Sequence, residues 1–497
     1  MPLLLAVCAT LALGAASGDS PTIDEPGHLV AGLAVWHEGD FRMAPDHPPL
    51  ARLWAALPVF LGSHAWQTLG SPGWSDGDWW RFGRWLFERN DPEALLWPAR
   101  AMMVGLLVAT CLATWWVARS LFGPAAGALA LLLAAFDPGF LAHGHYVTTD
   151  MPMTLATLAC LGTFARLLAE IRLGRLVAAA AALVALSLAK LAWVLVLPAL
   201  GAMALGAWLR SEAPLLARPG RAPVPLHGRA RRARWLAALA GLLALALWAG
   251  LWAAYGCRYA ALTGPDADHA TMYPGSVFGG PRPEDMEEAW ELLLRDPQTA
   301  RPREGLLPAL VRVARRHRLL PEAYVYGLAS LDRKSQQRTA YLSGEIYAGG
   351  RVEYFPLTLA WKTPLPSLVL AGMGLAAVAL GRARSQAPLL ALGLGTFTVV
   401  YAVVTLGADL NIGQRHLLPL YPAVFVAAGA AAAWADTRVG RVAVPALAAW
   451  LCASSLAAYP HFLGYFNELA GGWRRGHLHL ADSNVDWSQD LARLRQW

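Results

Sequence analysis

Long apolar runs are the feature that most constrains the fold of this chain. Several of them reach the roughly 20 helical residues that are needed to cross the hydrocarbon core of a bilayer, and short arginine-bearing turns separate them. Only 15% of the 497 residues are charged, whereas about 25% is usual for a soluble domain, and the mean hydropathy is +0.38. These features predict an all-α, polytopic membrane protein.

The apolar runs predict about eleven transmembrane helices. The segment 1–17 resembles the core of a signal peptide but lacks a basic region before it, so we expect a first transmembrane helix there. Residues 1–458 would form one transmembrane module and residues 459–497 an extracytoplasmic tail. Lys190 interrupts an apolar stretch from 176 to 209 and is expected to split it into two short helices. The other runs are Leu95–Phe122, Ala125–Leu141, Met153–Leu168, Leu176–Ala189, Leu191–Leu209, Trp235–Tyr255, Phe355–Leu380, Ala387–Leu406, Leu417–Trp434 and Val442–Ala458.

Arginine placement predicts the orientation of the chain. The loop from Arg210 to Arg234 carries seven arginines, and the positive-inside rule makes such a loop cytoplasmic. Counting helices from this loop puts Asp24, Asp150 and Lys190 on the extracytoplasmic side of a multi-pass protein of the inner membrane. The same count puts two long polar loops, 19–94 and 258–352, outside. The net charge of +7 therefore indicates membrane orientation and no nucleic-acid partner.

The first of these loops is rich in tryptophan, which prefers the headgroup level of a bilayer. We therefore expect its helices to lie along the membrane surface. It begins with two adjacent acids, Asp24 and Glu25, directly after the first apolar segment. One of these carboxylates is suited to act as a general base for an acceptor hydroxyl. The alternative is structural, with Asp24 capping a helix that begins near Pro26.

Four further polar groups are candidates for a site on the same side. His47 precedes two prolines, which hold it in an extended turn, and it suits either phosphate binding or a plain helix entry. Asp150 ends a polar run before a span, where an N-cap explains it equally well. Lys190 needs a partner or the interface, with snorkelling as the alternative. Arg415 with His416 suits phosphate binding, with interfacial anchoring as the alternative.

The polar tail is the remaining open feature. Its acids and amides either face the site or solvate the outer surface, and composition does not decide between these. No spacing of histidine, cysteine and acidic residues marks a metal site. A divalent cation at Asp24 or Asp150 is compatible with the sequence, which does not require one.

Several short motifs resemble those of a known group of enzymes. They are DEPGH (24–28), DHPPL (46–50), TTDMP (148–152), PEAYVYGL (321–328), YLSGE (341–345), YFPLTLAWKTPLP (354–366), GQRHLLPLYP (413–422), YFNELAGG (465–472) and DSNVDWSQDL (482–491). In their order and placement they resemble the lipid-linked sugar transferases of the protein O-mannosyltransferase kind. That group includes bacterial relatives that add aminoarabinose to lipid A.

The resemblance implies a GT-C fold with an extracytoplasmic active site. It also implies a polyprenyl-phosphate sugar donor, a protein, lipid or glycan acceptor, and inversion at the anomeric carbon. Asp24 would be the base with Glu25 beside it, and Asp150 the second acid. Arg415 and Lys362 match positions that hold the donor phosphate. His47 stands where the lipid A branch has a lysine, so a lysine contact is not carried over.

Two departures and two rival functions complete the expectations. No WWD triplet occurs, the nearest being Trp79-Trp80-Arg81, which argues against an oligosaccharyltransferase. The chain ends soon after DWSQDL, so a larger soluble tail domain is expected to be missing. A transporter or flippase of lipid-linked sugars would place acids in mid-membrane, but the predicted spans carry almost none. A catalytically inactive scaffold would have lost the acids of DEPGH, and they are present.

Overall fold

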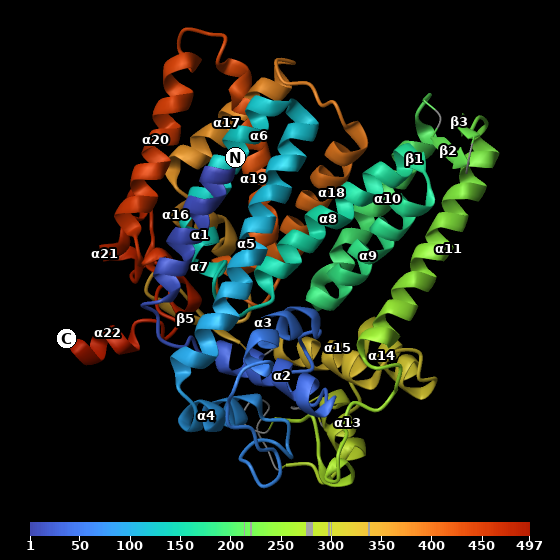
Figure 1. The fold of residues 1–497 in the computed structure, drawn as a ribbon, viewed down its shortest axis with the longest axis vertical. Coiled ribbons are helices and arrows are strands. Elements are labelled where there is room, and N and C mark those ends of the chain that lie inside the picture. Colours follow the sequence, from blue (N-terminus) through green and yellow to red (C-terminus); the bar gives the residue numbers. More distant parts are fainter. Residues whose placement is uncertain (213, 219–220, 275–281, 297–298, 300, 336–337) are drawn as a thin grey trace.

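The computed structural model describes the whole chain except residues 213, 219–220, 275–281, 297–298, 300 and 336–337. The described part is a bundle of long helices with a group of shorter helices at one end (Figure 1). Among the described residues, seven helical segments are long and apolar enough to cross a membrane. They are α5 (Pro92–Phe122), α8 (Asp150–Ala169), η1 (Leu191–Val196) with α10 (Leu197–Leu209), α11 (Arg229–Ala254), α18 (Pro388–Leu406), η3 (Gln414–Leu420) with α19 (Tyr421–Gly429) and η4 (Ala430–Trp434), and α20 (Gly440–Ala458).

Four further segments account for the rest of the predicted spans. The pair α16 (Tyr354–Lys362) and α17 (Leu365–Ala379) is apolar enough but bends by 107°. The other three are shorter apolar helices: α1 (Pro2–Ala16), α6 (Pro124–Phe136) and α9 (Leu173–Ala189). The prediction of an all-α, polytopic chain is thus confirmed, while the count of eleven spans stays a prediction. The predicted break at Lys190 is confirmed, because α9 ends at Ala189 and Lys190 is extended before η1.

The two predicted extracytoplasmic loops form the group of short helices, which we call the cap. The first loop supplies α2 (Glu25–Glu38), α3 (Leu50–Phe60) and α4 (Trp79–Arg89), and α2 packs against both of the others. The second supplies η2 (Ala267–His269), α13 (Met286–Leu294), α14 (Leu306–Arg316) and α15 (Glu322–Ser335). Each loop packs around an apolar core to which residues of the bundle also contribute. Figure 1 shows the cap gathered at the lower end of the bundle.

The arginine-rich loop lies at the opposite end of the bundle. There β1 (Glu170–Ile171) pairs in parallel with β2 (Leu215–Arg218), which pairs in antiparallel fashion with β3 (Arg221–Pro225). The helix α11 starts beside this small sheet and runs down to the cap (Figure 1). The cap and the arginine-rich loop are therefore on opposite sides of the helices, which is the arrangement that the charge count requires.

The C-terminal tail folds back onto the first loop. It contains η5 (Phe462–Gly464), η6 (Glu468–Ala470), α21 (Trp473–Gly476), η7 (Asp482–Asn484) and α22 (Leu491–Gln496). The backbone N–H groups of Ser20 and Ile23 donate to the carbonyls of Gln489 and Trp487 at 2.8 and 3.1 Å. Two other elements complete the fold, the helix α7 (Pro138–His143) and the hairpin of β4 (Thr339–Leu342) with β5 (Glu345–Ala348). The two ends of the chain thus meet beside the start of α2.

Candidate active site

Asp24 stands at the entrance of α2 and faces an arginine from far along the chain. The helix begins at Glu25 with Pro26 in its first turn, so Asp24 occupies the N-cap position, yet its side chain makes no capping hydrogen bond. Its Oδ2 instead accepts from Nη1 of Arg415 at 2.7 Å, and the two side chains are 15% and 12% exposed. The capping alternative is therefore not realised, and the carboxylate is directed toward a cation.

Glu25 points the other way, into the protein. Arg100 of α5 donates to both of its oxygens, at 2.9 and 2.6 Å. The backbone N–H groups of Thr22 and Val147 donate as well, at 2.9 and 3.1 Å. Burial raises the pKa of Glu25, but Arg100 and these hydrogen bonds outweigh burial and lower it. The carboxylate is fully buried, so the structure does not bring Glu25 to the place expected of a catalytic group.

Arg415 is held by residues of the tail. It follows Gly413, at which an added Cβ would lie 2.3 Å from Oγ of Ser483, so only glycine permits this close approach. The side chain of Asn484 accepts from the backbone N–H of Gln414 at 2.8 Å. The ring of Trp487 lies 4.3 Å from the guanidinium of Arg415. The tail motif therefore fixes the position of this arginine, which answers the question that composition left open.

A second ion pair lies beside the first. Nζ of Lys190 is 2.5 Å from Oδ1 of Asp150, and the charges of Arg415 and His416 act on the same carboxylate. Asp150 opens α8, but the cap residue before it, Thr149, makes no side-chain capping bond. The structure thus brings together five of the residues that the sequence marked as candidates, Asp24, Asp150, Lys190, Arg415 and His416. Two cations and two carboxylates balance one another at this end of the bundle.

Several buried side-chain atoms around these pairs have no hydrogen-bond partner within the described part of the chain. They are Nδ1 of His28, both ring nitrogens of His143, Nε2 of His416, Nε of Arg415 and Oγ1 of Thr148. Buried polar atoms are nearly always paired in native proteins. Burial lowers the pKa of His28 to about 4 and that of His143 to about 3, so both are neutral at pH 7. Neutral imidazoles offer one donor and one acceptor each, which suits a polar ligand.

His47 joins this region through His28. The rings of His28 and His47 are 4.8 Å apart, and Arg52 donates to the carbonyls of Met43, Ala44 and His47. The turn at His47 is therefore rigid, as its prolines predicted. Next to it, Asp46 pairs with Lys334 of α15 at 2.9 Å. Burial raises the pKa of Asp46, but Lys334 and His47 lower it well below its usual range.

Two residues of this region, His28 and Lys334, were not predicted from the sequence as site residues. His28 lies four positions after Asp24, and residues with that spacing share a helix face, so DEPGH contained the signal. Lys334 is one of only three lysines in the chain, but nothing near it in the sequence points to Asp46. Lys334 and Asp46 are 288 positions apart in the sequence, and they meet only because α15 packs on the first loop.

Lys362 has a different environment from the one expected. Its Nζ donates to the carbonyls of Leu463 and Asn484, both at 2.7 Å, and it lies 4.3 Å from the ring of Phe466. The side chain is buried. Lys362 thus fastens the tail to α16, and the structure does not bring it to Arg415 as a phosphate ligand.

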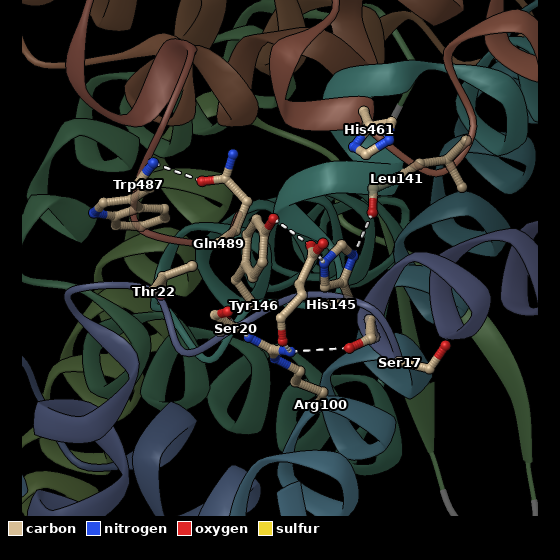
Figure 2. A network of polar contacts seen from close by, with 12 residues as sticks. Ser17, Ser20, Thr22, Arg100, Leu141, His145, Tyr146, His461, Trp487 and Gln489 are labelled. Atoms are coloured by element: carbon tan, nitrogen blue, oxygen red, sulfur yellow. Dashed lines mark hydrogen bonds and ion pairs between the residues drawn. The ribbon is translucent and has the colours of Figure 1, made fainter. Parts of the chain in front are cut away.

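A large cavity lies on the other side of Trp487. It has a volume of about 1080 Å³ and is lined by α20 and by the tail, with Asp19, His145 and Tyr146 at its polar end. Asp19 accepts from the hydroxyl of Tyr146 at 2.7 Å and from Arg493 at 2.9 Å. Figure 2 shows His145 and Tyr146 side by side in this network, with Arg100 close by. The ring of Trp487 lies 5.9 Å from that of Tyr146, at the cavity, and 4.3 Å from the guanidinium of Arg415, at the ion pairs.

No metal centre is evident among the residues that the structure describes. Within them, no group of three or more histidine, cysteine, aspartate or glutamate side chains is arranged to hold a metal ion. The carboxylates at the site instead face side-chain cations, Asp24 with Arg415 and Asp150 with Lys190.

Comparison with known families gives one sequence match. Residues 86–218 match the model of a family described as dolichyl-phosphate-mannose-protein mannosyltransferase. The matched part runs from α4 to β2 and contains Arg100, Asp150 and Lys190. For that part of the chain, the match confirms the resemblance to lipid-linked sugar transferases that the motifs indicated. No curated protein matches the chain.

Among solved structures, similar chains include two of ArnT from Cupriavidus metallidurans. The one bound to undecaprenyl phosphate is 16% identical and has a TM-score of 0.49, and the one in the apo state is 14% identical with a TM-score of 0.48. Both comparisons cover 98% of this chain and 74% of the other. The Archaeoglobus fulgidus oligosaccharyltransferase in complex with zinc and sulfate is 12% identical, with a TM-score of 0.45 over 96% of this chain and 53% of that chain.

Proposed function

We propose that this protein is an inverting membrane glycosyltransferase with a GT-C fold. It moves a sugar from a polyprenyl-phosphate donor to an acceptor hydroxyl on the extracytoplasmic side of the inner membrane. The observation that carries the proposal is the ion pair of Asp24 with Arg415 at the cap end of the bundle. In this pair, the carboxylate of Asp24, which makes no helix-capping hydrogen bond, faces Arg415. Arginine is the side-chain cation best suited to bind a phosphate. The family match over residues 86–218 supports the same class of reaction.

The donor phosphate binds to Arg415, Lys190 and His416. Arginine donates in a fixed fork that matches phosphate oxygens, while lysine adds a point charge. In the protein without donor, Arg415 is paired with Asp24 and Lys190 with Asp150. These ion pairs compensate the two positive charges at a partly buried site. When phosphate takes over Arg415, Asp24 loses its partner and becomes available to the acceptor. His416 adds a ring nitrogen that has no partner among the described residues.

The transfer is a single displacement. The acceptor oxygen bonds to C1 of the sugar while the bond from C1 to the phosphate oxygen breaks, and Asp24 takes the proton of the attacking hydroxyl. The electron pair of the broken bond stays on the leaving lipid phosphate, whose charge Arg415 and Lys190 neutralise. Attack opposite to the departing phosphate inverts the anomeric carbon. The protein, lipid or glycan that supplies the hydroxyl is bound from the extracytoplasmic side.

The other predicted residues have supporting roles in this proposal. Glu25 locks the entrance of α2 to α5 through Arg100 and thereby positions Asp24. Asp150 holds Lys190 in place. The proposed mechanism assigns no role to a divalent cation, because Arg415 and Lys190 supply the positive charge at the phosphate. Lys362 positions the tail, which in turn carries Trp487 to Arg415.

The variant Asp24→Asn tests the proposal. In purified protein it should lose at least about a hundredfold in sugar transfer, the lower range for removal of a general base, while it still binds undecaprenyl phosphate. The matched control is Asp91→Asn, an exposed residue that caps α5, since asparagine caps a helix as well as aspartate does. If Asp24→Asn transferred sugar at the rate of the wild type, Asp24 would not be the general base. Movement of the lipid across the membrane without any sugar transfer would favour a flippase instead.

A further inference from the structure

We infer that Asp46, His28, His47 and Trp79 form a sugar-binding subsite that takes a neutral, hydroxyl-bearing sugar. The inference rests on the proposed function and adds to it a class of donor sugar. It assigns His47 to the sugar and not to the donor phosphate, to which the sequence assigned it.

The four side chains form one cluster under the second loop of the cap. The ring of His28 lies 4.8 Å from that of His47 and 6.0 Å from that of Trp79. Nε2 of His47 is 3.7 Å from Oδ2 of Asp46. Lys334 closes the cluster, 2.9 Å from Asp46 and 5.7 Å from the centre of the Trp79 ring. Residues from α2, α4, α15 and the turn at 46–47 therefore meet at one point.

Within the residues that the structure describes, each member of the cluster has one polar atom without a hydrogen-bond partner. These atoms are Nδ1 of His28, Nδ1 of His47, Oδ1 of Asp46 and Nε1 of Trp79, and all are buried. His28, Asp46 and Trp79 are 2%, 6% and 5% exposed. Burying a polar group without a hydrogen bond costs free energy. Four such atoms in one cluster indicate a ligand that supplies several hydrogen bonds at once.

The four atoms without partners are suited to hydrogen-bond the hydroxyl groups of a sugar. A carboxylate oxygen accepts, an indole N–H donates, and a neutral imidazole does either, while a hydroxyl both donates and accepts. Lys334 already balances the charge of Asp46. The guanidinium of Arg52 beside the cluster donates to three backbone carbonyls, so the cluster leaves no free carboxylate to pair with the ammonium of an amino sugar. A neutral sugar meets it without burying an unpaired charge.

The position of the cluster agrees with the proposed reaction. His28 lies one helical turn beyond Asp24 on α2, and the charges of Asp24, Arg415 and Asp46 all act on it. His28 is thus within electrostatic range of the proposed base, of the phosphate-binding arginine and of the carboxylate of Asp46. A sugar joined to a phosphate at Arg415 would extend toward His28 and Asp46.

Two glycines in the motifs explain how the chain builds this cluster. A Cβ added to Gly27 would lie 1.7 Å from the ring of Trp79, and a Cβ added to Gly327 would lie 2.0 Å from the carbonyl oxygen of Pro45. Glycine at 27 lets Trp79 pack onto α2 beside His28. Glycine at 327 lets α15 approach the turn at 46–47, so that Lys334 reaches Asp46. DEPGH and PEAYVYGL therefore each provide a close approach as well as side chains.

Binding of lipid probes to the detergent-solubilised full chain tests the inference without relying on turnover. The probes are undecaprenyl phosphate and its mannosyl, glucosyl, galactosyl and aminoarabinosyl phosphodiesters. The wild type should bind one of the neutral donors at least about tenfold more tightly than the sugar-free lipid. Asp46→Asn, and Trp79→Phe as a second variant, should abolish that preference while binding undecaprenyl phosphate as the wild type does. Asp91→Asn serves as the control, and unfolding midpoints verify that each variant is folded.

Three results would overturn the inference. One is equal affinity of the wild type for all the lipids, and another is preference for the aminoarabinosyl donor. The third is weaker binding of sugar-free undecaprenyl phosphate by Asp46→Asn, which would make the cluster part of the phosphate site. Failure of the proposed function would be seen separately, as unchanged binding of undecaprenyl phosphate by Arg415→Gln or as absence of sugar transfer from every donor.

Discussion

Two adjacent acids at the start of α2 have opposite environments. Successive residues on a helix point about 100° apart, so Asp24 faces Arg415 while Glu25 faces Arg100. The sequence marked both as candidates, because their common position beside an apolar segment does not show which one is buried. The decision depends on Arg100, 75 positions away, and on Arg415, 391 positions away. No local pattern contains those partners.

The buried histidines make an acid-sensitive stability measurable at the scale of single residues. The pKa of His28 is lowered from 6.5 to about 4, so the unfolded chain binds the proton more tightly. Above pH 6.5, His28 is neutral in both states and does not lower the free energy of unfolding. As the pH falls from 6.5 toward 4, protonation of His28 in the unfolded chain lowers the free energy of unfolding by about 3 kcal/mol. We expect the unfolding midpoint of the wild type to drop between pH 6.5 and 4, and His28→Asn to reduce that drop.

The exposed His317 provides the control for this experiment. The midpoint of His317→Asn should drop between pH 6.5 and 4 by as much as that of the wild type. His143, whose pKa is lowered to about 3, keeps part of the acid sensitivity in the His28 variant. An equal drop in the wild type and in His28→Asn would show that His28 is not buried as a neutral group.

Among the elements, the apolar runs predicted nearly every long helix, because a span requires length and composition alone. Lys190 marked a real break, since a charged residue cannot continue an apolar helix through the bilayer without a partner, and its partner, Asp150, lies at the start of α8. The sharp bend between α16 and α17 was not foreseen. Two prolines there, Pro364 and Pro366, were the available signal.

Helix packing within the bundle gives a prediction at the same scale. A Cβ added to Gly374 of α17 would lie 1.7 Å from the carbonyl oxygen of Ala427 on α19, so the two backbones are in close contact. Small residues permit such contacts between membrane helices. We expect Gly374→Ala to destabilise the protein by about 1–3 kcal/mol through overpacking, measured as a lower unfolding midpoint.

The neighbouring Gly372 lies on the same helix and serves as a matched control. Apart from the nearby backbone of its own helix, no atom of the described residues lies within 4 Å of the Cβ that would be added there. Gly372→Ala should therefore be neutral or stabilising by up to about 1 kcal/mol, the difference in helix propensity. Equal midpoints for the two alanine variants would contradict the close contact between α17 and α19.

For the whole molecule, the two ends of the bundle differ in chemistry. The cap and the tail lie at one end, and the small sheet with the arginine-rich loop lies at the other (Figure 1). The distribution of arginines among the loops predicted this separation. Such a prediction requires only the number of spans between two loops and no knowledge of side-chain contacts. How the tail closes on the first loop could not be predicted, since hydrogen bonds such as Ile23 to Trp487 join the two ends of the chain.

The separation of the two ends makes orientation directly testable with thiol chemistry. Cys257 is exposed and follows α11 at the cap end, while Cys8, Cys111 and Cys160 are buried. A membrane-impermeant maleimide should label Cys257 in intact cells. In a Cys257→Ser background, Ser211→Cys, an exposed position in the arginine-rich loop, should react only after the cells are opened. The reverse pattern would place Asp24 in the cytoplasm, away from any sugar donor presented outside, and would exclude the proposed extracytoplasmic reaction even if Asp24 and Arg415 proved essential.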